Sequence, residues 1–167
     1  MVLTDPIALP QEEDMTRLAA ALARRLGAGD TLLLDGPVGA GKTTFARALI
    51  RARLGDPEAE VPSPTFTLVQ TYGEGPEAIW HADLYRLSGP EEILETGLAD
   101  AFGRALCLVE WPGRLGALAP RDALTLRLDH RGPTGDEGRI GVFEGPDPWA
   151  DRLAGLAQGI PAEAARG

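Results

Sequence analysis

The sequence has one cysteine, no asparagine, one lysine and no long hydrophobic run. With Cys107 alone, no disulfide bond can form within the chain, and its apolar neighbours predict a buried core residue rather than a catalytic thiol. No apolar stretch approaches the roughly 18 residues needed to cross a bilayer, so we expect no membrane contact. Residues 1–14 lack the basic flank and apolar core of a signal peptide. We therefore expect a cytoplasmic protein.

Positive charge is also scarce. The chain has 16 basic residues against 25 acidic ones, a formal net charge of −9. This charge repels phosphate backbones at long range and argues against tight, independent binding of nucleic acid. We expect any RNA to be reached only indirectly, through a partner.

What the chain does contain is a pattern of helices and strands that suits one domain of 167 residues. Hydrophobic periodicity predicts a surface helix over 11–27 and a buried strand over 30–35. A second helix is expected over 42–54, where Gly55 ends it.

The second half of the chain alternates hairpins with buried elements. A helix over 90–102, divided by Gly97, precedes a second buried strand over 105–111. Two pairs of segments alternate apolar and polar residues around glycine-rich turns and predict β-hairpins: 64–72 with 78–87, and 122–130 with 138–145.

Residues 36–43 read GPVGAGKT and fit the phosphate-loop pattern G-x-x-x-x-G-K-[ST] in full, between an expected strand and an expected helix. Glycines let backbone N–H groups point at phosphate oxygens, and the helix N-terminus favours negative charge. Lys42 would neutralise the outer phosphates, the Thr43 hydroxyl would bind Mg²⁺, and Thr44 would bond a phosphate. The candidate nucleotide-binding residues of the loop are Gly36, Gly39, Ala40, Gly41, Lys42, Thr43 and Thr44.

A phosphate loop of this kind requires a carboxylate at the end of a neighbouring strand. Glu110 ends the apolar strand CLVEW, and Asp83 lies in the segment HADLYRL. We assign Thr43 and Glu110 as magnesium ligands, and Lys42, Asp83 and Glu110 as catalytic residues, with Asp83 orienting water or a switch residue. His81 is interpreted as a surface residue of the hairpin rather than a catalytic group.

The bound nucleotide is predicted to be ATP. Guanine-specific proteins of this class usually carry Asn-Lys-x-Asp, which a chain without asparagine or a second lysine cannot supply. No arginine is placed by motif to reach the γ-phosphate in the transition state, a contribution of about 10³ to 10⁵ in rate. We therefore expect Mg²⁺-dependent ATP hydrolysis that is slow without partners.

Five stretches together resemble the TsaE family, the bacterial P-loop ATPases of tRNA threonylcarbamoyladenosine biosynthesis. They are GPVGAGKTTFAR, SPTFTLVQTY, HADLYRL, PEEILETGL and CLVEWP, and the resemblance as a whole covers residues 10 to about 145. The resemblance implies an α/β, single-domain, P-loop NTPase-like fold: a central mixed sheet with antiparallel hairpins, flanked by helices. We expect this domain over 1–150, and over 151–167 a C-terminal helix and frayed tail that form no separate domain.

The resemblance also implies partners and further site residues. TsaE proteins work beside two proteins, of the TsaD and TsaB type, that make threonylcarbamoyl-adenylate and transfer its threonylcarbamoyl group to tRNA. Residues 63–67 resemble a switch segment near the γ-phosphate, which makes Thr65 a candidate nucleotide-binding residue. From the residues alone, Thr65 and Thr67 are equally well strand formers. Trp111 resembles an aromatic residue of the family, with either a packing or a chemical role.

Two other functions stay open at this point. A small-molecule kinase would need an acceptor pocket and an arginine-bearing lid, but Arg86, Arg104 and Arg114 are scattered and no lid-like insertion is evident. A nucleotide-gated binding module would hold ATP and dock without hydrolysing it. ATP hydrolysis measured with the partner proteins, and again with small acceptor molecules, separates the partner-dependent ATPase, the kinase and the binding module.

Overall fold

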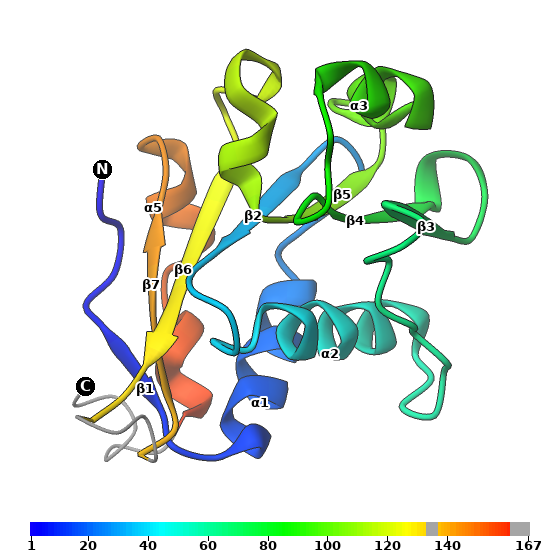
Figure 1. Ribbon diagram of the computed structural model, residues 1–167. Helices are drawn as coiled ribbons and strands as arrows, with labels where there is room; N and C mark the ends of the chain where they lie inside the picture. The colour runs from blue at the N-terminus through cyan, green and yellow to red at the C-terminus, as the bar shows by residue number, and fades with distance from the viewer. Residues whose placement is uncertain (133–136, 161–167) are drawn as a thin grey trace.

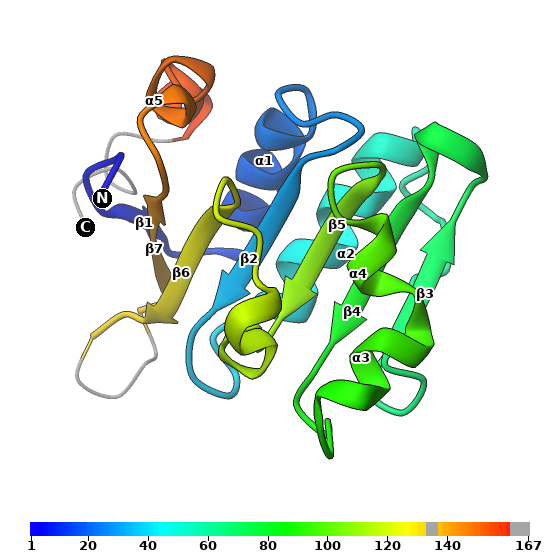
Figure 2. The ribbon, with the colours of Figure 1, turned by 90° about the horizontal axis from the view of Figure 1, so that it is seen from above.

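A mixed β-sheet runs through the computed structural model, which describes residues 1–132 and 137–160 (Figure 1). Seven strands lie in the order β1-β7-β6-β2-β5-β4-β3, as Figure 2 shows from left to right. Their bounds are β1 Ile7–Leu9, β2 Thr31–Asp35, β3 Val69–Tyr72, β4 Ile79–Asp83, β5 Leu106–Glu110, β6 Leu124–His130 and β7 Arg139–Glu144.

The centre of the sheet is parallel and its margins are antiparallel. Strands β6, β2, β5 and β4 run in one direction, so their carboxyl ends meet at one edge. Strand β3 pairs antiparallel with β4, and β7 pairs antiparallel with both β6 and β1. Both predicted hairpins and the predicted mixed sheet are therefore confirmed. Strand β1, only three residues long, gave no signal in the sequence.

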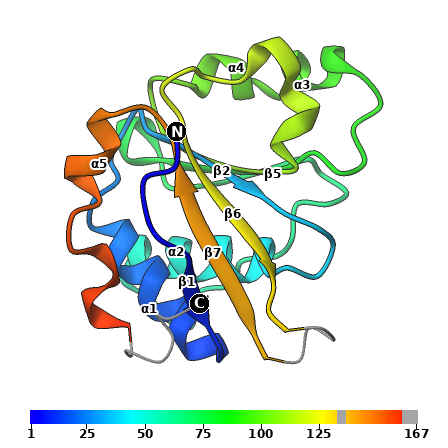
Figure 3. The same ribbon diagram turned by 90° about the vertical axis from the view of Figure 1, so that its left-hand side faces the viewer.

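Helices cover both faces of this sheet in two layers (Figure 3). Helices α1 (Glu12–Ala23) and α2 (Lys42–Leu54) lie on one face, and α3 (Pro90–Thr96) and α4 (Leu98–Ala101) lie on the other. Helix α5 covers Pro148–Arg152, and 3₁₀ turns cover Gly75–Glu77, Pro112–Leu118 and Leu156–Gly159. Within the residues that the structure describes, no helix is long and apolar enough to span a membrane.

Alternating side chains of the strands fill one core on each face. Leu32 and Leu34 pack in the cluster between the sheet and helices α1 and α2, whereas Leu33 packs in the cluster between the sheet and helices α3 and α4. Cys107, also on the α3 and α4 side, is fully buried as predicted, and burial raises the pKa of its thiol to about 12. Its thiol is thus protonated at neutral pH and unsuited to nucleophilic chemistry.

Glycines set the helix boundaries that the sequence predicted. Gly97 has a φ of 82° and ends α3 at the point where α4 begins, and Gly55 has a φ of 66° and ends α2. These left-handed conformations favour glycine because it has no Cβ. The predicted first helix is shorter than expected, since α1 ends at Ala23 rather than near residue 27.

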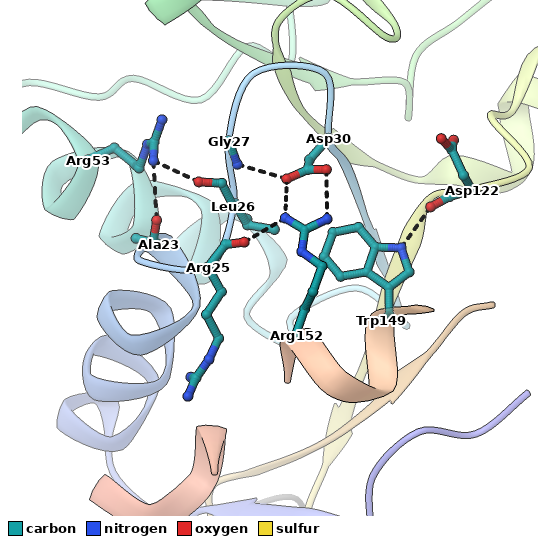
Figure 4. A network of polar contacts seen from close by, with 9 residues as sticks. All are labelled: Ala23, Arg25, Leu26, Gly27, Asp30, Arg53, Asp122, Trp149 and Arg152. Carbon is teal, nitrogen blue, oxygen red and sulfur yellow. Dashed lines mark hydrogen bonds and ion pairs between the residues drawn. The ribbon is translucent and has the colours of Figure 1, made fainter. Parts of the chain in front are cut away.

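Helix α5 is fastened to the loop before β2 by Arg152 (Figure 4). The Arg152 guanidinium donates to both carboxylate oxygens of Asp30, at 3.0 and 2.5 Å, and to the backbone carbonyl of Arg25 at 2.6 Å. It also lies 4.0 Å from the ring centroid of Trp149, whose indole N–H donates to the carbonyl of Asp122. The tail expected to fray, 161–167, lies outside the described residues.

Trp149 anchors this corner, so its loss should reduce stability. Trp149 is 4% exposed, and Trp149→Ala should lower the free energy of unfolding by about 3 kcal/mol, because truncating a buried aromatic leaves a cavity. Trp149→Phe keeps most of the packing and loses the hydrogen bond to Asp122, so about 1 kcal/mol is expected. Urea unfolding measures both. Equal losses in the two variants would contradict the packing role.

Candidate functional site

The loop over 36–43 follows the carboxyl end of β2, and its last two residues, Lys42 and Thr43, are the first two of α2. Gly36, Gly39 and Gly41 all have positive φ, at 143°, 78° and 100°. A Cβ on Gly36 would lie 2.1 Å from the carbonyl oxygen of Leu128, and one on Gly41 would lie 2.2 Å from Cε of Met15. Only glycine fits at position 36, where the obstacle is backbone, while at position 41 the φ of 100° favours glycine. The backbone therefore curls tightly and leads into the N-terminus of α2, where N–H groups and the helix dipole favour an anion.

Lys42, the first residue of α2, folds back into its own loop. Its ammonium donates to the carbonyls of Gly36 at 2.6 Å and Pro37 at 2.8 Å, and lies 3.9 Å from the ring centroid of Trp111. The residue is 5% exposed, and this burial lowers the pKa of its amine, with Glu110 the strongest opposing influence. The ammonium is held by neutral carbonyls and a ring face, so a phosphate oxygen could replace these contacts with a stronger, charge-assisted one.

Glu110 and Asp83 end adjacent parallel strands at the edge where the loop begins. The register pairs Asp83 of β4 with Glu110 of β5, and Leu34 of β2 with Glu110. The Thr43 hydroxyl donates to Oε1 of Glu110 at 2.6 Å. Thr43 and Glu110 are thus the pair of oxygen donors that could hold a magnesium ion. Both carboxylates are buried, Glu110 at 2% and Asp83 at 5% exposure.

Asp83 faces the segment that precedes β3. Its Oδ2 accepts from the Thr65 hydroxyl at 3.0 Å, and its Oδ1 accepts from the backbone N–H of Tyr85 at 3.0 Å. The Ser63 hydroxyl lies 2.7 Å from that of Thr65. Neither Thr65 nor Thr67 lies in a strand, so the strand-former interpretation of this pair is wrong. Thr65 lines the cleft of the loop, whereas Thr67 accepts from the side chain of Gln70.

His81 corrects the sequence interpretation, which placed it on the surface. It is fully buried, and its Nε2 lies 2.7 Å from Oε2 of Glu110. The interpretation was wrong because β4 pairs not only with β3 in the hairpin but also with β5, which places it inside the sheet. The residues at positions 79, 81 and 83 then share the face that α2 covers, since side chains alternate along a strand.

The loop opens onto a cleft of about 330 Å³. Besides the loop, its walls include Thr65, Asp83 and Glu110, together with Tyr85, Trp111 and Arg139. Tyr85 and Trp111 have ring centroids 4.9 Å apart, and Trp111 takes a left-handed φ of 59° that brings it beside Lys42. Of the site residues named from the sequence, all but Gly36 and Ala40 line this cleft, and Tyr85 is a wall that the sequence analysis did not name.

Arg139, the first residue of β7, was also missed. Its Nε donates to the carbonyl of Gly39 at 3.0 Å. The residue paired with it in β6, His130, places its Nε2 3.2 Å from the carbonyl of Val38. Both contacts cross about 90 to 100 residues of sequence and follow no local motif. Only the order of strands in the sheet brings this hairpin to the loop.

A second cleft of about 280 Å³ adjoins the loop at Gly41 and Thr44. The end of β1 and the start of α1 form its wall, which comprises Leu9, Pro10, Gln11, Glu12 and Met15. Arg139 lines both clefts. The two hollows therefore meet over the first turn of α2.

The model of one protein family, "Threonylcarbamoyl adenosine biosynthesis protein TsaE", matches residues 9–138 of the chain. Proteins named "tRNA threonylcarbamoyladenosine biosynthesis protein TsaE" are similar to it in several bacteria. The one from Rickettsia bellii is 39% identical over 127 residues, which cover 76% of this chain and 88% of the relative. The one from Bacillus subtilis is 37% identical over 125 residues, covering 74% and 75%.

Two further comparisons differ in how much of the chain they cover. The relative from Rickettsia felis is 46% identical over 103 residues, 62% of this chain, and the match spans only 60% of that relative's length. The crystal structure of YdiB from Bacillus subtilis superposes with a TM-score of 0.73 at 26% identity, over 96% of this chain and 99% of YdiB. The fold is thus similar across almost the whole chain.

Proposed function

Because the chain belongs to the TsaE family of threonylcarbamoyl adenosine biosynthesis proteins, we propose that it is a Mg²⁺-dependent ATPase. It would act beside TsaD- and TsaB-type partner proteins while threonylcarbamoyladenosine is formed in tRNA. The observation that carries the ATPase proposal is the 2.6 Å contact of Thr43 with Glu110 at the end of the glycine loop. The net charge of −9 supports contact with tRNA through partners only.

Four side chains of the cleft, Lys42, Thr43, Asp83 and Glu110, have direct roles in this proposal. Lys42 would exchange the carbonyls of Gly36 and Pro37 for phosphate oxygens. Thr43 and Glu110 would hold Mg²⁺, which supplies positive charge where negative charge develops on the phosphates. Asp83 would orient the attacking water, because its carboxylate lines the cleft and is itself held by Thr65.

The second cleft suits the nucleotide base. It adjoins the loop at Gly41 and Thr44, where a phosphate chain bound to the loop would leave. Apolar walls of Leu9, Pro10 and Met15 fit the flat faces of a purine, and polar neighbours fit its edge. Discrimination of ATP from GTP would then depend on contacts with that edge rather than on an Asn-Lys-x-Asp motif, which the chain lacks.

Trp111 should report nucleotide binding by fluorescence. Its ring faces the Lys42 ammonium at 3.9 Å, and this contact must change when Lys42 turns to phosphate. We expect ATP to change tryptophan emission, and Trp111→Phe to lose most of that change. Trp149→Phe is the matched control, because Trp149 packs at the C-terminal corner and lines neither cleft. An unchanged response in Trp111→Phe would contradict the exchange of Lys42 partners.

The segment next to Thr65 supports the partner part of the proposal. Phe66 is 82% exposed, although it follows the residue that bonds Asp83. The Arg86 guanidinium lies 4.7 Å from the ring centroid of Phe66, so the ring is presented beside a cation. Phenylalanine and arginine are both enriched at protein–protein interfaces relative to the rest of the surface. Phe66 would therefore couple the cleft to a docked partner.

Phe66→Ser should separate nucleotide binding from partner stimulation. The exposed ring contributes little to the folded core, so ATP affinity and melting temperature should stay within error of the wild type. Stimulation of hydrolysis by the TsaD- and TsaB-type proteins should fall at least about tenfold. Leu54→Ser is the control, since Leu54 is exposed at the far end of α2. Equal stimulation of both variants would remove Phe66 from the interface.

Single-turnover hydrolysis of ATP, with and without the cognate TsaD- and TsaB-type proteins, tests the proposed function. We expect slow turnover alone and a large acceleration with partners, because a complementary residue could then reach the γ-phosphate. Binding of the partners without any acceleration would favour a nucleotide-gated binding module. Phosphate transfer to small acceptors, without a partner effect, would favour a kinase.

A further inference from the structure

His81 and Glu110 form a buried pair beneath the cleft. His81 is fully buried, Glu110 is 2% exposed, and Nε2 of the ring lies 2.7 Å from Oε2 of the carboxylate. The other oxygen, Oε1, accepts from Thr43 at 2.6 Å. Each oxygen of Glu110 therefore has its own hydrogen-bond donor, and the carboxylate is held in one orientation.

The strand register places His81 two residues further from the sheet edge than Glu110. Asp83 pairs with Glu110, and His81 pairs with Leu108, so all four side chains point to the α2 face. Leu108 belongs to the core that α1 and α2 cover. His81 thus approaches Glu110 from the core side, while Thr43 approaches it from the loop.

The hydrogen bonds of the ring specify which nitrogen carries the proton. An ionised carboxylate only accepts hydrogen bonds, so Nε2 must donate. Within residues 1–132 and 137–160, the buried Nδ1 of His81 has no hydrogen-bond partner. The buried ring therefore acts as a fixed Nε2–H donor.

We propose that His81 is a positioning residue: its Nε2–H holds Oε2 of Glu110 so that Oε1 alone is presented to Thr43 and the magnesium position. The inference rests on the proposed function, because it assumes that Glu110 takes part in binding Mg²⁺. Without this donor, the carboxylate would rotate between several orientations and lose the preorganisation that fixes a metal ligand. The role is distinct from catalysis, because His81 does not line the cleft.

Two substitutions at position 81 separate positioning from packing. His81→Gln places an amide N–H at a similar reach from the backbone as Nε2, so the donor is kept. His81→Leu fills comparable space without a donor. The measurement is ATP affinity by calorimetry, with saturating Mg²⁺ and with EDTA, together with the melting temperature.

We expect Mg²⁺ to enhance ATP affinity about tenfold less in His81→Leu than in the wild type, in line with losses seen when metal ligands lose their supporting bonds. His81→Gln should recover the enhancement to within about threefold, and affinity in EDTA should be equal in all three proteins. A merely structural role would instead lower the melting temperature of both variants and leave the enhancement alone.

Wild-type enhancement in His81→Leu, or a loss in His81→Gln as large as in His81→Leu, overturns the inference. If His81→Leu does not fold, His81→Asn replaces it, because the shorter amide cannot reach Glu110 from the same backbone position, and the same comparison with His81→Gln applies. If the wild type itself shows no effect of Mg²⁺ on ATP binding, the proposed metal site fails instead. The two failures are therefore distinguishable.

Discussion

Lys42→Ala should weaken ATP binding about 100-fold and abolish hydrolysis while the protein stays folded. Two charge-assisted hydrogen bonds to phosphate, at about 1.5 kcal/mol each, account for a loss of this size. The ammonium bonds neutral carbonyls of its own loop, at 2.6 and 2.8 Å, and lies against the ring of Trp111. Lys42→Ala thus removes the ammonium whose hydrogen bonds would pass from these carbonyls to a phosphate.

The folded state should tolerate the loss of Lys42 for an electrostatic reason. Burial lowers the pKa of the amine, while the carboxylates of Glu110, Asp35 and Asp83 act in the opposite direction. A lysine whose pKa is lower in the folded than in the unfolded state is unfavourable when charged, and this cost fades as the pH rises through the lowered pKa. At neutral pH, removing the charge therefore should not reduce the free energy of unfolding.

Calorimetric ATP affinity, single-turnover hydrolysis and thermal unfolding measure the three parts of this result. Lys42→Arg is the control for charge, because it keeps the positive charge but replaces the compact ammonium, held by two carbonyls and the Trp111 ring, with a planar guanidinium. We expect it to restore little of the affinity. A folded Lys42→Ala protein with unchanged hydrolysis would exclude the loop over 36–43 as the nucleotide site.

The parts of the site that lie in one stretch of sequence could be predicted from that stretch. The glycine loop needs only its own residues and the elements on either side, so its place between β2 and α2 followed from the motif. Glu110 could be placed because a charged residue closing a fully apolar strand must lie at the strand end. Gly97 and Gly55 could be placed because their backbone angles favour glycine.

The residues that the sequence did not reveal depend on which strands become neighbours. His81 was assigned to the surface because its segment was treated as half of an isolated hairpin, whereas β5 pairs with it on the other side. Arg139 reaches Gly39 only because β7 follows β6 beside the loop. The left-handed φ of Trp111, which accompanies the contact of its ring with Lys42, is likewise not signalled by its residue type, because left-handed angles are uncommon in residues other than glycine.

Glu110→Gln should lose most of the effect of Mg²⁺ on ATP affinity, by about 30-fold, and hydrolysis with it. The side chain keeps its size but loses the negative charge that faces Thr43 at 2.6 Å, and a neutral amide oxygen is a much poorer ligand for a hard cation. The amide nitrogen would also face either Thr43 or His81, both of which donate to the carboxylate in the structure. ATP affinity in EDTA should change little.

Asp83→Asn should give the complementary result. Asp83 pairs in register with Glu110, but its oxygens accept from Thr65 and from the backbone of Tyr85, so it is directed to residues 63–67. The effect of Mg²⁺ on ATP affinity should stay within about threefold of the wild type. Partner-stimulated single-turnover hydrolysis should fall about 100-fold, the usual size of a lost proton-accepting or water-orienting group.

The two variants control each other, because both replace a buried carboxylate with its amide at the same edge of the sheet. A general loss of structure would lower the melting temperature and both readouts together. Separate effects require that the two carboxylates have different chemical roles. If Asp83→Asn loses the effect of Mg²⁺ while Glu110→Gln keeps it, the roles are reversed, and Asp83 is the metal carboxylate. His81 would then position a residue that does not bind the metal, so this pair of measurements also decides whether the buried His81–Glu110 contact acts on Mg²⁺ at all.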